Sequence, residues 1–331
     1  MSLLSDKQNG IASPTLAPHL RDVEHGGGGR ELVIGLINNM PDPALKATER
    51  QFMALLRAAA PNTRIRFHCF SLPSVARSEA ARWHIDTEYA DIAELPRLRI
   101  DGLIVTGAEP KAATLPEEAY WPDLIAIIDW AKAHTRSAIF SCLAAHAAVL
   151  HLDGIERQRL GTKCSGVFDC ARVGSDWLTA DLTSPLRIAH SRLNELGESD
   201  LLDCGYRVLT RSTEAGVDIF TKAFRSHFVF FQGHPEYDAL SLQREYLRDV
   251  ARYLSGERDV YPAVPHGYFD TATESRLATF RKRASIERTP ALAAELPALT
   301  LRADIAAGTA AAVIFKNWVD YLAEGALVSR L

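Results

Sequence analysis

The sequence has no excess of positive charge. Its 331 residues contain 37 Lys and Arg against 41 Asp and Glu, which gives a formal net charge of −4 at pH 7. Proteins that bind nucleic acids draw much of their affinity from positive side chains on the phosphate backbone, so we expect no nucleic-acid partner. The hydrophobic content of 47% and the charged content of 24% are those of an ordinary globular protein that buries a core of its own.

Cysteine is scarce, and its spacing argues against two common roles. There are five cysteines, an odd number, and no two of them form a Cys-x-x-Cys pair: Cys69, Cys142, Cys164, Cys170 and Cys204. A disulfide framework and a zinc site are therefore both disfavoured. We expect no metal and a reducing compartment.

Long apolar runs are also missing. The first 25 residues mix charges and prolines with a few apolar side chains, and the most apolar stretch, residues 137–152, contains Ser, Cys and His. A secretory signal needs an uninterrupted apolar stretch, and a membrane span needs about 18 to 20 apolar residues. We therefore expect a cytoplasmic protein with no membrane partner.

The N-terminal segment, residues 1–30, ends in four consecutive glycines at positions 26–29. Ordering consecutive glycines costs much backbone entropy, so we expect this segment to be a flexible arm. A single domain with a C-terminal helical extension is expected over residues 31–331.

From residue 32 onward, strand-like apolar runs alternate with stripes of helical spacing. The pattern predicts strands at 32–37, 64–70, 103–105 and 138–140, and helices at 48–60, around 124–131 and at 143–152. Parallel strands need crossover helices, so this alternation predicts a mostly parallel sheet covered on both faces. In such sheets the sites form at the carboxyl ends of the strands.

Beyond residue 155 the pattern changes. Closely spaced strands at 206–210, 217–221 and 228–231 are predicted to be antiparallel additions to the same sheet. Helices are predicted at 240–254 and near 309–322, whereas residues 256–307 show no clear period. The expected fold class is α/β, a mostly parallel sheet flanked by helices with antiparallel additions.

Cys142 lies where the predicted strand 138–140 runs directly into the small-residue helix 143–152. This arrangement predicts a nucleophile elbow, in which the N–H groups at the helix start favour a thiolate and bind an oxyanion near Leu143. A buried structural cysteine is the alternative, and the flanking glycines of the usual elbow motif are absent.

His234 and Glu236 lie two residues apart, directly after the predicted strand 228–231. A turn at a strand end can aim the imidazole at a distant nucleophile while the carboxylate accepts a hydrogen bond from its other nitrogen. A surface His-Pro turn is the alternative. The chain order Cys, His, Glu favours a catalytic triad made of Cys142, His234 and Glu236.

Six segments resemble the homoserine O-succinyltransferase / O-acetyltransferase family over roughly residues 31 to 325: DGLIVTGA (101–108), AYWP (119–122), KCSGV (163–167), HSR (190–192), GHPEYDA (233–239) and KNW (316–318). The resemblance implies a class I glutamine-amidotransferase-like fold. It also implies Cys142 as the acyl-thioester nucleophile, His234 as general base and Glu236 as the carboxylate that orients it.

Substrate contacts carry over from the same resemblance to Lys163, Ser191 and Arg248. Lys163 and Ser191 have no other support in the sequence. Glu245 is expected to contact substrate as well. It lies three residues before Arg248 on the predicted helix 240–254, so the two face the same way and could be only a solvated ion pair. Because a guanidinium suits a bidentate contact, we expect Arg248 to bind the carboxylate of an amino acid.

The sequence departs from the family pattern at two lysines. The family's Lys-Lys pair after Met-Pro is absent, and whether Lys46 replaces either lysine is open. Lys111 occupies the position that discriminates acyl donors, where the family usually has Glu or Gly. A cation there could pair with the free carboxylate of succinyl-CoA, so Lys111 favours succinyl-CoA over acetyl-CoA. Contact with solvent or with a CoA phosphate is the alternative.

The resemblance and the triad together imply an acyl-CoA-dependent O-acyltransferase. It would acylate the hydroxyl of homoserine or serine through a cysteine acyl-enzyme, in methionine biosynthesis, with acyl-CoA as co-substrate and no bound cofactor. A glutamine amidotransferase and a catalytically silent binding protein are the alternatives. Relatives are commonly dimers, so a homodimer is expected.

Overall fold

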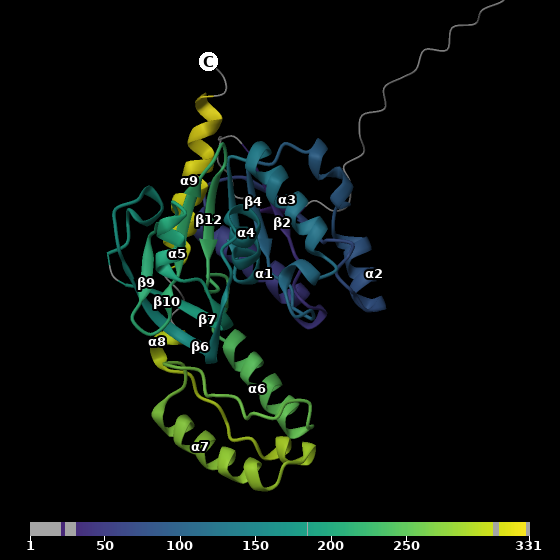
Figure 1. Cartoon of the computed structure of the whole chain (residues 1–331), viewed down its shortest axis with the longest axis vertical. Helices are drawn as coiled ribbons and strands as arrows, with labels where there is room; N and C mark the ends of the chain where they lie inside the picture. The colour runs from purple at the N-terminus through teal and green to yellow at the C-terminus, as the bar shows by residue number, and fades with distance from the viewer. Residues whose placement is uncertain (1–20, 24–30, 184, 307–310, 329–331) are drawn as a thin grey trace, which may run out of the picture.

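The computed structural model describes residues 21–23, 31–183, 185–306 and 311–328 (Figure 1). Most of the predicted N-terminal arm, 1–20 and 24–30, lies outside the described residues. Within that segment the structure adds a strand that the sequence did not predict, β1 (Arg21–Val23), which pairs antiparallel with β3 (Ile65–Phe70).

A sheet of eight strands forms the centre of the molecule, in the order β1-β3-β2-β4-β5-β12-β11-β8. Its parallel strands are β2 (Leu32–Ile37), β3, β4 (Gly102–Thr106), β5 (Ser137–Ser141) and β12 (His227–Phe231). β11 (Ile219–Ala223) and β8 (Arg207–Val208) extend it antiparallel. The prediction of a mostly parallel α/β sheet with antiparallel additions is confirmed. Residues 228–231 were wrongly expected among the additions, because they form β12, which runs parallel to β5.

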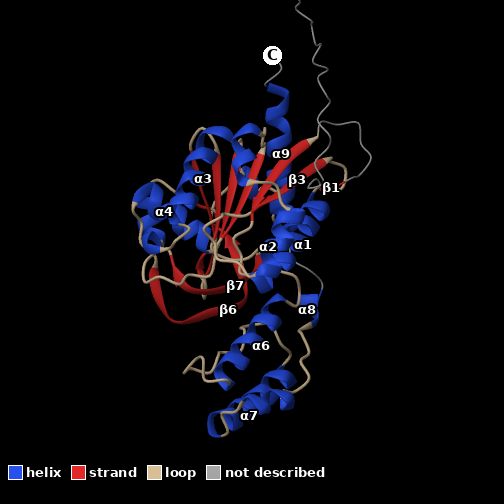
Figure 2. Ribbon diagram, turned by 90° about the vertical axis from the view of Figure 1, so that its right-hand side faces the viewer, coloured by secondary structure: helices blue, strands red, loops and turns tan. Residues whose placement is uncertain are grey.

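Helices cover both faces of this sheet, as Figure 2 shows. On one face α1 (Asp42–Ala59) and α9 (Ala311–Val328) pack against the strands through buried side chains such as Phe52 and Trp318. On the other face α3 (Trp121–His134) and α4 (Leu143–Asp153) bury side chains such as Ile128. α1 begins earlier than predicted because Pro43, in the first turn, needs no N–H partner there.

A second sheet of four strands was not predicted. It contains β6 (Gln158–Arg172), β7 (Leu186–Glu195), β9 (Thr210–Ser212) and β10 (Gly216–Val217), in the order β10-β9-β6-β7. The predicted strand at 206–210 is therefore wrong as one unit, since β8 joins the large sheet and β9 the small one. The predicted strand at 217–221 is divided in the same way between β10 and β11. β6 carries many polar side chains, so it lacks the apolar run by which the other strands are visible in the sequence.

A helical lobe lies beyond the small sheet in both views (Figures 1 and 2). It is built from α6 (Ser241–Leu254) and α7 (Thr271–Ile286), which share an apolar cluster of their own. The remaining helical segments are α2 (Glu79–Glu88), α5 (Glu198–Asp203), α8 (Ala303–Ala306) and the 3₁₀ turns Ile92–Arg97, Leu115–Glu117, Trp177–Thr179 and Pro290–Glu295.

None of the helices in the described ranges combines the length and apolarity that crossing a membrane would require. The carboxyl ends of the parallel strands β2, β4, β5 and β12 lead into residues that line one cavity, among them Met40, Gly107, Cys142 and His234. The cavity thus lies where a parallel sheet is expected to place its site.

Candidate active site

Cys142 joins β5 to α4 through a strained turn. Its backbone has φ 52° and ψ −114°, and it is the only non-glycine residue with positive φ in the described part of the chain. Its N–H donates to Phe231 O of β12 at 2.8 Å, which anchors the turn to the neighbouring strand. Such a conformation costs about 1–3 kcal/mol and commonly marks a functional residue. The predicted elbow geometry is thus present.

The N-terminus of α4 offers donors beside this thiol. The N–H of Leu143 is in the first helical turn and therefore has no intrahelical acceptor. Gly107, at the end of β4, lies so close that an added Cβ would be 2.5 Å from Leu143 Cβ and 3.1 Å from Leu143 N. Only glycine allows this approach, which brings the end of β4 directly against the helix start.

His234 is held by both its backbone and its ring. Its N–H donates to Ala189 O at 2.7 Å, and its Nδ1 lies 2.9 Å from Glu236 Oε1. Tyr237 stacks on the imidazole with ring centroids 4.1 Å apart. Because Glu236 occupies Nδ1, Nε2 is the nitrogen that is left for Cys142, whose side chain is a hydrogen-bond partner of His234.

The charges around His234 favour its protonated form. Burial alone would lower its pKa, but the charges of Cys142 and Glu236 and the hydrogen bonds to both raise the pKa well above its ordinary value. A cysteine and a carboxylate on the two sides of one imidazole are the arrangement that activates a thiol nucleophile. The three residues predicted as a triad are therefore brought together by the fold.

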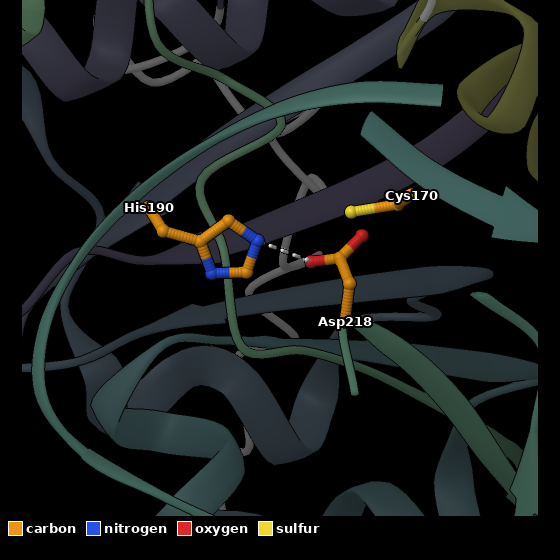
Figure 3. Close-up of side chains that lie close together, drawn as sticks. All are labelled: Cys170, His190 and Asp218. Atoms are coloured by element: carbon orange, nitrogen blue, oxygen red, sulfur yellow. Dashed lines mark ion pairs between the residues drawn. The ribbon is translucent and has the colours of Figure 1, made fainter. Parts of the chain in front are cut away.

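Cys170, His190 and Asp218 form a fully buried cluster (Figure 3). It adjoins the His234 turn through Asp218, which accepts a hydrogen bond from Gly233 N. Its ligand-type atoms lie within 4.8 Å of one another, as in a metal site. However, Arg192 Nε donates to His190 Nδ1 at 3.3 Å, which puts the proton of the neutral ring on Nε2. A protonated Nε2 cannot be a metal ligand.

This cluster instead braces the turn that carries His234. His190 Nε2 faces Asp218 Oδ1 at 3.4 Å, and the same oxygen accepts a hydrogen bond from Gly233 N at 3.2 Å. Burial, followed by the charges of Arg192 and His234, lowers the pKa of His190 well below its ordinary value, so the ring is neutral.

The four residues predicted to bind substrate gather on one side of the cavity, on β6, β7 and α6. Lys163 Nζ lies 3.6 Å from Glu245 Oε2, and Ser191 donates a short hydrogen bond to the same oxygen. Glu245 also accepts from Tyr237 Oη at 2.7 Å. Arg248 makes no ion pair with Glu245 in the described structure and instead donates to Asp249 at 3.1 and 3.2 Å.

The cavity that joins these groups has a volume of about 380 Å³. Cys142, His234, Glu236 and all four predicted substrate residues line it. Two lysines are placed differently. Lys111 is exposed in an adjoining hollow with its backbone N–H on Glu118, and Lys46 is an exposed residue of α1. Neither belongs to the described lining of the cavity around Cys142.

Sequence reasoning missed three polar residues of the site: Tyr237, Asp249 and Asp218. Tyr237 follows the His-Pro-Glu turn directly, and Asp249 is the neighbour of Arg248. Both could have been found because they are adjacent in the sequence to residues predicted for the site. Asp218 had no such signal, because it reaches Gly233 only through the pairing of distant strands.

The sequence model of the homoserine O-succinyltransferase family matches residues 23–326. The chain is 60% identical to the homoserine O-succinyltransferase of Bradyrhizobium japonicum, covering 98% of this chain and 100% of that protein. It is 57% identical to the homoserine O-succinyltransferase of Rhodopseudomonas palustris, covering 98% and 99%. A solved glutamine amidotransferase from Methylobacillus flagellatus aligns at 15% identity with a TM-score of 0.48, over 89% of this chain and 96% of that one, a likeness too distant to speak to chemistry.

Proposed function

Because the chain belongs to the homoserine O-succinyltransferase family, we propose that it transfers the succinyl group of succinyl-CoA to the hydroxyl of homoserine in methionine biosynthesis. The observation that carries this proposal is identity of 60% along 98% of the chain to a relative of that name, together with the Cys142–His234–Glu236 arrangement. We also propose that the protein forms a homodimer and that it acts in the cytoplasm.

In the first half reaction the Cys142 thiolate attacks the thioester carbonyl of succinyl-CoA. The new C–S bond forms as the carbonyl oxygen takes the negative charge, and the N–H of Leu143 is the donor we assign to it. When the intermediate collapses, the bond to the CoA sulfur breaks and the leaving thiolate takes the proton of the His234 imidazolium. The products are free CoA and a succinyl thioester on Cys142.

Acylation then changes the state of His234. The charge of Cys142 is one of the two charges that raise the pKa of His234, and the thioester abolishes it. The pKa of the imidazole therefore falls, and the ring becomes a neutral base held by Glu236. In the second half reaction His234 takes the proton of the homoserine hydroxyl. The hydroxyl oxygen attacks the thioester carbonyl, and Cys142 leaves as a thiolate.

The acceptor is assigned to the polar side of the cavity. Glu245 is partly buried and negatively charged, because the charge of Lys163 and the hydrogen bonds it accepts outweigh the effect of burial and lower its pKa. It is the partner we assign to the ammonium group of homoserine. Arg248, which is still 44% exposed, is the partner for the carboxylate.

The proposal is tested by a matrix of donors and acceptors. Succinyl-CoA and acetyl-CoA are each combined with homoserine and with serine, and CoA release is followed. We expect the highest kcat/KM for succinyl-CoA with homoserine. A preference for acetyl-CoA or for serine would establish one of the alternative acyltransferases. Glutamine hydrolysis without CoA release would contradict the proposal outright.

A further inference from the structure

The free carboxylate of a succinyl donor needs a partner inside the cavity. It lies two methylene groups beyond the thioester carbonyl, so it enters the cavity together with the reacting carbon. A charge taken out of water requires a cation or hydrogen-bond donors nearby. Six basic side chains line the cavity and could supply them: Arg157, Arg159, Lys163, Arg192, Arg248 and Arg258.

Most of these cations already have partners. Lys163, Arg248 and Arg258 all face the carboxylate of Asp249, at distances of 3.0 to 3.9 Å. Arg192 donates to a ring nitrogen and to two backbone carbonyl oxygens. These four side chains therefore already have partners within the protein.

Arg159 is an exposed side chain, so water already solvates its charge. Arg157 is different. It is only partly exposed, and its Nη1 is buried with no hydrogen-bond partner among the described residues. Burial lowers the pKa of Arg157, and Tyr120, Glu118 and Cys142 are among the groups whose charges act on it. Glu118 makes no contact ion pair with it in the described structure, and Oε1 of Glu118 is taken up by the N–H groups of Lys111 and Ala112 at 2.6 and 2.8 Å.

Tyr120, which lines the adjoining hollow together with Lys111, carries a second unsatisfied group. Its hydroxyl oxygen is buried and has no hydrogen-bond partner in the described part of the chain. Burial and the charge of Glu118 raise the pKa of Tyr120, so the phenol keeps its proton and can donate it. Arg157 acts electrostatically on this same tyrosine. Buried donors without acceptors are costly unless a ligand supplies the acceptor.

We propose that Arg157 binds the free carboxylate of the succinyl group and thereby selects the acyl donor. This inference rests on the proposed function. It assigns to Arg157 the task that the sequence alone suggested for Lys111, whose exposed side chain belongs to the adjoining hollow. The inference also assigns the two substrates to different sides of the cavity. The succinyl chain lies toward Arg157, and the amino acid lies toward Arg248.

The test compares donors that differ in this one group. Butyryl-CoA has the same number of acyl carbons as succinyl-CoA but no carboxylate, and kcat/KM for both is measured with homoserine. Arg157→Met is expected to lower kcat/KM for succinyl-CoA about 10- to 100-fold and to leave butyryl-CoA within about twofold. Arg97→Met, which removes an exposed cation outside the cavity lining, is the control.

Three results would overturn the inference. Equal losses for both donors in Arg157→Met would place Arg157 on the CoA phosphates or on the amino acid. Unchanged kcat/KM values for both donors in Arg157→Met would leave Arg157 without a role in donor choice. A loss of preference in Lys111→Met but not in Arg157→Met would return the task to Lys111.

A binding measurement separates this inference from the proposed function. Calorimetric affinities of succinyl-CoA and butyryl-CoA are compared in Cys142→Ala protein, with and without Arg157→Met. If the wild type shows no acyl transfer but Arg157 still accounts for tighter binding of succinyl-CoA, the function fails and the inference stands. If the wild type succinylates homoserine but Arg157→Met leaves both affinities unchanged, the inference fails alone.

Discussion

At Glu236, one carboxylate oxygen carries the whole interaction with the imidazole. Oε1 lies 2.9 Å from His234 Nδ1, whereas Oε2 is buried without a hydrogen-bond partner among the described residues. Glu236→Gln keeps the shape but removes the charge that stabilises the imidazolium. We expect kcat to fall about 10²- to 10⁴-fold with little change in KM. Steady-state kinetics check this, and a variant that retains most of its kcat would show that the carboxylate is only structural.

Asp218 is a buried carboxylate whose ionisation opposes folding. Burial is the largest influence on it and raises its pKa from 3.8 to about 6, although hydrogen bonds from Gly233 and Thr210 partly compensate. A carboxyl with a raised folded-state pKa stabilises the fold fully below the unfolded pKa and loses that contribution as the pH rises through the folded pKa. The contribution of Asp218 is therefore present near pH 4 and lost by about pH 7.

Asp218→Asn should remove this dependence. Relative to the wild type, the variant's free energy of unfolding is expected to rise by on the order of 2–3 kcal/mol between pH 4 and pH 7. Urea unfolding at several pH values measures the difference, and Asp86→Asn, at an exposed position, is the control. A difference that stays constant with pH would contradict the buried, titrating role of Asp218.

Among the elements, the contact between the end of β4 and the start of α4 decides the geometry of the elbow. In Gly107→Ala the new Cβ would meet Leu143 at 2.5 Å, so the first turn of α4 must shift. We expect a loss of about 1–3 kcal/mol in stability and a clear loss in kcat, because the thiol and the helix N–H groups move apart. Thermal unfolding and kinetics check both effects.

Gly174→Ala is the matched control for this variant, because an added Cβ there meets no atom within 4 Å. It is expected to leave both kcat and the unfolding temperature nearly unchanged. If Gly107→Ala behaved in the same way, the close packing of β4 on α4 would have no part in the chemistry.

How far each element could be predicted depended on its burial. β2, β4 and β5 are buried on both faces and so appear as apolar runs, which is why they and the crossover helices were predicted. β6 is mostly exposed, and α7 buries only Thr273, Leu277, Phe280 and Ala284, so neither had a strong pattern. Their places depend on long-range pairing and on the α6–α7 cluster, which no local pattern encodes.

The same contrast holds for the site. Cys142 and the His234–Glu236 turn were predictable because each follows directly from a strand end. The bond from Gly233 to Asp218 and the unsatisfied Nη1 of Arg157 were not, since both arise from chain segments that meet only in three dimensions.

At the scale of the whole molecule, two structural units supply the two halves of the site. The edge of the large sheet carries Cys142 and His234, whereas the β6–β7 hairpin and α6 carry Lys163, Ser191 and Arg248. The first unit has the groups that break and form the thioester, and the second has the groups assigned to the acceptor. A variant in the second unit should therefore spare the first half reaction.

Arg248→Lys tests this division. A lysine keeps the charge but cannot reproduce the forked guanidinium contact, so KM for homoserine is expected to rise about tenfold or more. The rapid release of CoA in a single turnover without homoserine should stay within about twofold of the wild type. Equal damage to both phases would show that Arg248 belongs to the donor side as well.

The covalent acyl-enzyme is the claim on which the whole account depends, and mass spectrometry of the protein mixed with succinyl-CoA alone tests it most directly. We predict a gain of one succinyl mass on the peptide that contains Cys142, its loss on adding homoserine with formation of O-succinylhomoserine, and no gain in Cys142→Ala. An unmodified Cys142 peptide in a protein that still succinylates homoserine, or a succinyl group on any other residue that homoserine removes, would contradict the account.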